Sequence, residues 1–115
     1  MSEFLSNLSA AMASSVEAGG RGVVRVEGRR RLAASGAIWA SEGVILTAHH
    51  VVHGDEEIGI GLPDGRTTIA RVAGRDPSTD LAVLRTDAPG LTAVTRTAGE
   101  ELRVGHLVLA LGRPG

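Results

Sequence analysis

Ser35-Gly-Ala-Ile-Trp-Ala-Ser-Glu-Gly-Val-Ile-Leu-Thr-Ala-His-His-Val-Val52 is the stretch that decides the fold of this chain. It predicts two apolar strands joined by a short turn at Ser41-Glu42-Gly43, and a pair of histidines follows where the second strand ends. Thirty positions after His50 (80 − 50), Asp80 precedes another apolar strand, Leu81-Ala-Val-Leu84. A histidine at one strand end and an aspartate at another are two members of the relay that activates a nucleophile in hydrolytic enzymes.

Composition restricts the class of protein around this stretch. The chain has 115 residues, 43% of them hydrophobic and 22% charged, which is typical of one globular domain. Its net charge of −1 gives no electrostatic basis for binding nucleic acid. The absence of cysteine excludes disulfides, thiol catalysis and cysteine-rich metal sites. No apolar run approaches the ~20 residues that span a bilayer, so we expect no membrane span.

The N-terminal residues predict a helix. Between residues 2 and 18, apolar side chains recur at three-to-four spacing before Gly19-Gly20 ends the pattern. This stripe consists of Phe4, Leu5, Leu8, Met12 and Val16. The favoured interpretation is a helix that lies on the domain through the stripe, and the alternative is a contact with another subunit.

The rest of the chain predicts short strands. Alternating apolar residues and frequent turn residues indicate strands over 23–27, 32–40, 44–47, 57–62, 67–72, 81–85 and 106–111, with a long polar connection over 86–105. Because no crossover helix separates them, the strands should be antiparallel. A closed barrel is favoured over an open sheet because it leaves no exposed edge. The arginines at 29–31 could form a phosphate or acidic-peptide patch, but the small net charge favours a solvated turn.

Taken alone, the histidine cluster leaves alternatives open. His49, His50 and His53 could hold a metal ion, with acidic residues at 55–57 nearby. Spacing fixes no third ligand, however, so we expect no metal and no cofactor. Asp80 could simply support a turn, although Asp76 suits that duty better because proline follows it. At the mouth of a buried strand, the Asp80 carboxylate needs a partner, and a histidine N–H is a suitable one.

Four motifs together give a more specific signal. They are Ser35-Gly-Ala-Ile, Gly43-Val-Ile-Leu-Thr-Ala-His-His50-Val-Val, Asp76-Pro-Ser-Thr-Asp80-Leu-Ala-Val-Leu and Arg103-Val-Gly-His-Leu-Val-Leu-Ala-Leu-Gly-Arg-Pro-Gly115. In this order, over about residues 20–115, they resemble the protease domain of the HtrA/DegP family of trypsin-like serine proteases. The resemblance implies an all-β, six-stranded antiparallel barrel of the trypsin-like fold. It also implies that His50 is the catalytic base and that Asp80 is the acid that orients it.

The chain departs from the family pattern at the nucleophile. The family places its serine downstream in a Gly-Asn-Ser-Gly-Gly-like turn, and no such turn occurs here. The eight serines are Ser2, Ser6, Ser9, Ser14, Ser15, Ser35, Ser41 and Ser78. Ser35 matches an early barrel strand of the family, and Ser78 has no evident donor array. We therefore expect an N-terminal helix over 1–20, the first of two barrels over 21–104, and the first strand and crossing segment of the missing second barrel over 105–115.

These inferences predict the N-terminal half of a serine endopeptidase that is inactive alone. A polypeptide substrate should bind only with the second barrel present, and the apolar segment over 105–115 should promote self-association. A periplasmic or secreted location is suggested by the resemblance only. The alternative function is a non-catalytic barrel that binds peptide or regulates a partner.

Overall fold

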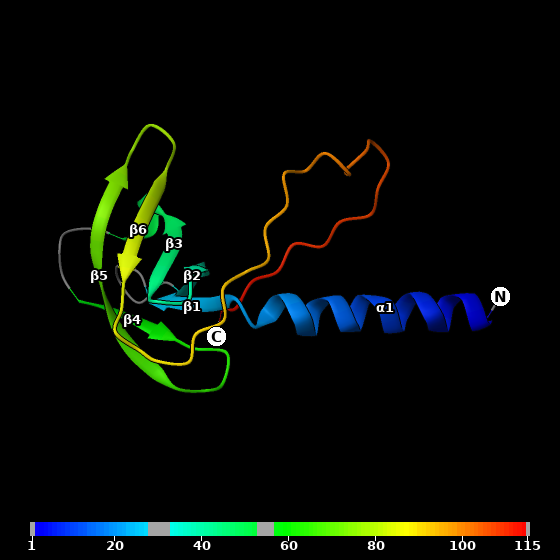
Figure 1. Cartoon of the computed structure of the whole chain (residues 1–115), viewed down its shortest axis with the longest axis horizontal. Helices are drawn as coiled ribbons and strands as arrows, with labels where there is room; N and C mark the ends of the chain where they lie inside the picture. The colour runs from blue at the N-terminus through cyan, green and yellow to red at the C-terminus, as the bar shows by residue number, and fades with distance from the viewer. Residues whose placement is uncertain (1, 28–32, 53–56, 115) are drawn as a thin grey trace.

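A computed structural model describes residues 2–27, 33–52 and 57–114 of the chain. One long helix leads into a barrel of six strands, and an irregular segment follows the last strand (Figure 1). The elements are α1 (Ser2–Gly20), β1 (Val23–Glu27), β2 (Ala33–Ala40), β3 (Val44–Ala48), the 3-10 turn η2 (His49–Val51), β4 (Ile58–Gly61), β5 (Thr67–Asp76) and β6 (Leu81–Arg85). The arginines at 29–31 lie outside the described residues.

The six strands close into an antiparallel barrel in the order β1-β2-β3-β6-β5-β4, which confirms the predicted fold. Alternate residues of each strand point inward, because successive side chains of a strand face opposite sides of the sheet. The largest fully buried side chains are Ile38, Ile45, Ile60, Leu84, Val24, Val26 and Val52. The two aromatic residues are excluded from this core, since Phe4 and Trp39 are 65% and 41% exposed.

The bounds of the six barrel strands agree with the sequence pattern to within one residue, except along β5. The structure gives β1 and β6 the predicted bounds, Val23–Glu27 and Leu81–Arg85. β5 continues to Asp76, beyond the predicted end at Val72. Its register against β6 shifts between Val72 and Gly74, and this bulge lets the strand remain paired with β6. An irregular register breaks the period-two pattern, so no local pattern predicts the extension.

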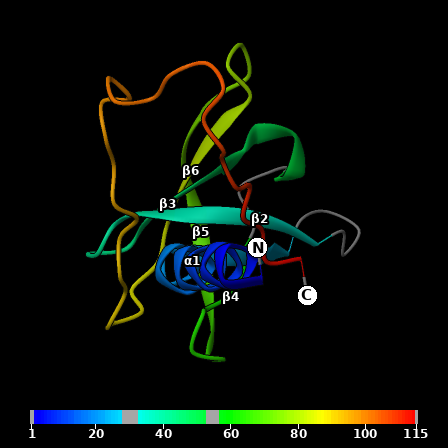
Figure 2. The same cartoon turned by 90° about the vertical axis from the view of Figure 1, so that its right-hand side faces the viewer.

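The helix does not lie on the barrel, so the favoured interpretation of its apolar stripe is wrong. None of the α1 residues is buried, and Figure 1 shows the helix extending away from the barrel, while Figure 2 looks along the helix axis. Gly22 N donates to Gly19 O at 3.2 Å and closes the turn that connects the end of α1 with β1. The alternative, a contact with another subunit, stays a prediction. Within the described ranges, no helix has both the length and the hydropathy needed to cross a membrane.

The segment after β6 leaves the barrel and returns to it (Figure 1). Contrary to expectation, residues 106–111 form no strand in this structure. Every barrel strand is already paired on both sides, so the segment finds no open edge to join. Its end is held by Arg113, whose N–H donates to Ser35 Oγ at 2.7 Å and whose guanidinium donates to Val23 O and Gly20 O at 2.8 and 2.9 Å. Membership of a second barrel stays a prediction.

Candidate active site

The pairing of β3 with β6 brings the histidine pair and Asp80 together. In this antiparallel ladder Ala48 lies opposite Leu81, and His49 N continues it by donating to Asp80 O at 2.9 Å. The η2 turn follows at once, because Val52 N donates back to His49 O at 3.2 Å. Residues far apart in the sequence therefore become neighbours through the register of two adjacent strands.

His50 and Asp80 form a two-point contact. The ring nitrogen His50 Nδ1 lies 2.6 Å from Asp80 Oδ2, and the backbone N–H of His50 donates to Asp80 Oδ1 at 2.8 Å. A carboxylate accepts hydrogen bonds, so this arrangement places the proton on Nδ1. Because the backbone contact fixes the carboxylate and the carboxylate fixes the ring, the tautomer and the orientation of His50 are set together.

Asp80 has an unusual backbone, while Asp76 organises the preceding turn. Asp80 has a φ of 59°, and it is the one non-glycine residue with positive φ among those that the structure describes. Aspartate tolerates this left-handed conformation better than most residues. Asp76 Oδ1 accepts hydrogen bonds from Ser78 N and Ser78 Oγ at 3.1 and 2.6 Å. The turn therefore does not need the Asp80 carboxylate, which faces His50 instead.

Sequence reasoning missed Arg75, which supports the histidine turn. Arg75 Nη1 donates to Val52 O at 2.7 Å and lies 3.4 Å from His49 Nδ1. These contacts connect the end of β5 with the residues that follow β3. They depend on the bulged β5–β6 register, for which the sequence contains no local signal.

The His50 ring lowers the pKa of the Asp80 carboxyl below its ordinary value of 3.8. The largest cause is the hydrogen bond from the ring, followed by the bond from the His50 backbone N–H. Both groups face solvent, because the His50 side chain is 71% exposed and that of Asp80 is 47% exposed. At neutral pH the carboxylate is therefore ionised and able to hold a proton on Nδ1.

The lowered pKa values predict how stability depends on pH. Asp64, Asp76 and Asp80 all have pKa values below 3.8 in the folded chain. The unfolded chain therefore binds more protons near pH 4, so stability is fully present above that pH and falls as the pH drops through the folded pKa values. We expect the urea midpoint to fall as the pH drops below about 4. Asp80→Asn should make this fall shallower, and an unchanged pH profile would contradict the assignment.

The structure describes only some of the residues that could have formed a metal site. His53, Asp55 and Glu56 lie outside the described residues, and in the remainder no group of three His, Asp or Glu side chains could hold a metal ion.

All eight serines are described. Ser35 Oγ accepts from Arg113 N at 2.7 Å, and Ser78 Oγ donates to Asp76 at 2.6 Å.

A hydrogen-bonded histidine and aspartate on a closed six-stranded antiparallel barrel form the arrangement expected for the class of trypsin-like serine hydrolases. Residues 34–115 match the trypsin-like peptidase domain family, and the chain belongs to this family. The relatives and solved structures that it resembles are HtrA/DegP-type proteases.

Relatives and solved structures agree with this assignment. A probable periplasmic serine endoprotease, DegP-like, from Halomonas elongata is 45% identical over 85 residues, which cover 74% of this chain and 18% of the relative. A DegP-like endoprotease from Chlamydia trachomatis is 34% identical over 90 residues, covering 78% and 18%. The HtrA-type protease AlgW with a tripeptide aligns at a TM-score of 0.74 and 37% identity, covering 81% of this chain and 32% of that one. The serine endoprotease from Yersinia pestis gives 0.73 and 33%, covering 81% and 35%. The chain thus spans less than a fifth of the length of these curated relatives.

Proposed function

We propose that this chain supplies the general base and the orienting acid of an HtrA-type serine endopeptidase. His50 is the base and Asp80 is the acid. The observation that carries this proposal is the 2.6 Å contact between His50 Nδ1 and Asp80 Oδ2, with the second carboxylate oxygen held by the His50 backbone. The relatives named periplasmic serine endoproteases support both the activity and a periplasmic or secreted location.

The proposed chemistry follows from the geometry. A serine hydroxyl is a weak nucleophile until a neighbouring imidazole removes its proton during attack. His50 would accept that proton on Nε2, because the contact with Asp80 keeps Nδ1 protonated. Asp80 would then stabilise the imidazolium, and His50 would return the proton to the leaving amine.

The nucleophile and the oxyanion-binding N–H groups are proposed to lie in a second barrel outside these 115 residues. The Ser35 and Ser78 hydroxyls already bond to Arg113 and Asp76. We expect the chain alone to show no hydrolysis of an unfolded protein and no stoichiometric labelling by a fluorophosphonate probe. Co-expression with a second barrel from an HtrA-type relative should restore both. Labelling of a serine in the isolated chain would contradict the proposal.

We also propose that the C-terminal segment drives self-association. Val104, Leu107 and Val108 are 108%, 84% and 72% exposed, so large apolar side chains of this segment face solvent. The double substitution Leu107→Glu and Val108→Glu should shift the chain from dimers or larger species toward monomers, while it retains the contacts of Arg113. Sedimentation velocity measures the shift. Ile69→Glu, at a half-exposed apolar position on β5, is the control and should leave association unchanged. An unaltered distribution in the double variant would refute this role.

A further inference from the structure

We propose that a cavity beside the β4–β5 hairpin is a binding site for a small oxyanion, such as a phosphate or carboxylate group. The cavity has a volume of about 270 Å³ and is lined by three arginines, Arg25, Arg66 and Arg113, together with residues between Gly61 and Thr67. This site is separate from the proposed protease chemistry. The hairpin lies at one end of β5, whereas Asp76 and the turn that leads to Asp80 lie at the other (Figure 1).

Strand register explains why the three arginines meet. Arg25 on β1 lies opposite Gly61 on β4, and Gly61 lies opposite Thr67 on β5. Arg66 precedes Thr67 in the hairpin, and Arg113 is brought to the same place by its bond to Ser35 Oγ. Ser35 itself pairs with Arg25 across β1 and β2. Segments from both ends of the chain therefore converge on one cavity.

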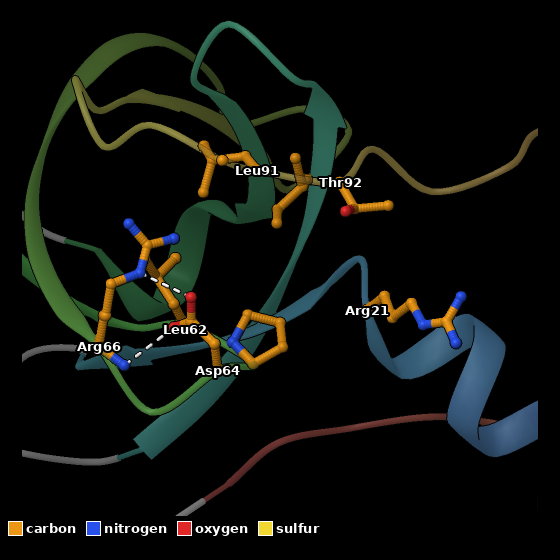
Figure 3. Close-up of a pocket in the computed structure, with 9 residues that line it drawn as sticks. Arg21, Leu62, Asp64, Arg66, Leu91 and Thr92 are labelled. Atoms are coloured by element: carbon orange, nitrogen blue, oxygen red, sulfur yellow. Dashed lines mark hydrogen bonds and ion pairs between the residues drawn. The ribbon is translucent and has the colours of Figure 1, made fainter.

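The charges around the cavity favour an anion. Arg25 Nη2 donates to Glu27 at 3.0 Å. Arg66 Nε donates to Asp64 at 2.6 Å, a contact drawn in Figure 3, which shows the neighbouring cavity that Arg66 also lines. The guanidinium of Arg113 donates to backbone carbonyls only, in the contacts that the described residues make. Glu27 and Asp64 do not line the cavity, but each pairs with one of its arginines, so three guanidinium groups and two adjacent carboxylates leave a net charge of +1 (3 − 2) beside the cavity.

Arg25 has a donor that its surroundings do not satisfy. Its Nε is buried and has no hydrogen-bond partner among the described residues. A buried donor without an acceptor is unfavourable, and native proteins rarely leave one. The side chain lies against Gly61, where an added Cβ would come within 3.1 Å of Nε. We propose that an oxyanion in the cavity supplies the acceptor that Arg25 lacks, which requires the side chain to turn its Nε from Gly61 toward the cavity.

The size of the cavity limits the ligand. Sites for drug-sized molecules usually have volumes of ~300–1,000 Å³, so a cavity of about 270 Å³ lies just below that range and has room for a phosphate or carboxylate group. Arginine is the residue best suited to such groups, because its planar fork matches two oxygens at once. The same chemistry fits free phosphate and the C-terminal carboxylate of a peptide.

The test follows the arginine Nε–H signals of the full chain by NMR. Sodium phosphate is titrated against sodium chloride at equal ionic strength, and a tripeptide with a free carboxylate is compared with its C-terminal amide. We expect saturable shifts of the Arg25 Nε–H and Gly61 amide signals with phosphate, and none with chloride or the amide. Saturation with the tripeptide acid would assign the peptide carboxylate as a source, and saturation with phosphate alone would assign the free anion.

Two substitutions decide whether Arg25 holds the anion. Arg25→Gln should weaken phosphate binding about tenfold or more, as for the loss of a hydrogen bond to a charged group. Arg85→Gln makes the same change in charge at an exposed position on β6 and should bind like the parent chain. Arg25→Lys keeps the positive charge but lacks the planar guanidinium, so it should also bind phosphate weakly. This variant provides the test if Arg25→Gln does not fold. Shifts that do not saturate, or that survive both Arg25 variants, would overturn the proposal.

Discussion

Replacing His50 with alanine is expected to lower peptide-bond hydrolysis about 10⁴-fold or more when the chain is paired with a second barrel that carries the nucleophile. Without the imidazole, no group removes the proton of the serine during attack or returns it to the leaving amine. The loss should fall on kcat, because the ring is not expected to contribute to substrate binding. Hydrolysis of a fluorogenic peptide, measured over a range of concentrations, separates kcat from KM.

The orienting acid gives a matched test of the same geometry. Asp80→Asn retains the size of the side chain and tolerates the φ of 59°. Its amide can donate to Nδ1, which would move the ring proton to Nε2 and leave the wrong tautomer for a base. We expect a loss of about 10⁴-fold in kcat.

His49→Ala is the control for both variants. The His49 ring lies 3.4 Å from Arg75 Nη1, and its backbone N–H, which pairs with Asp80 O, survives the substitution. We expect near-parent activity. Full activity in His50→Ala would show that His50 is not the base. If, in addition, His49→Ala were inactive, the role of base would pass to His49.

Gly43→Ala is expected to destabilise the barrel by about 2–5 kcal/mol, which is a large share of the stability of a small domain. Gly43 has a φ of 117°, which side chains with a Cβ rarely adopt, and an added Cβ would overlap the carbonyl oxygen of Thr86. The residue also joins two segments, because its N–H donates to Ala40 O at 3.1 Å and its carbonyl accepts from Thr86 N at 2.9 Å. The clash therefore cannot be relieved without disturbing the β2–β3 turn. Urea unfolding measures the loss.

Gly65→Ala separates the two causes. Gly65 also has a positive φ of 92°, but an added Cβ would have no atom within 4 Å. Only the backbone strain applies there, so the expected loss is about 1 kcal/mol. Equal losses at the two positions would show that the contact with Thr86 does not matter.

The sequence alone was sufficient to predict the barrel strands, because each has a local cause. Val24 and Val26 alternate with outward-facing residues along β1, and the same period recurs in Ile58 and Ile60 on β4. The closed barrel was also predictable from the sequence. The absence of crossover helices implied antiparallel strands, and a closed barrel is the arrangement that leaves none of their edges exposed. The pairing of His50 with Asp80 came from the family motifs, because a separation of 30 positions has no local periodicity.

Other features depended on tertiary contacts that no local pattern records. The stripe of α1 predicted a packed helix, but periodicity shows which face is apolar and not what covers it. The segment over 106–111 has the composition of a strand, yet a strand exists only beside a partner, and the closed barrel offers none. Arg75 at the histidine turn and the three arginines around one cavity depend on strand register. The sequence by itself thus determined the barrel and its motifs, whereas only the tertiary structure decided which distant side chains meet, because those contacts join residues that are remote along the chain.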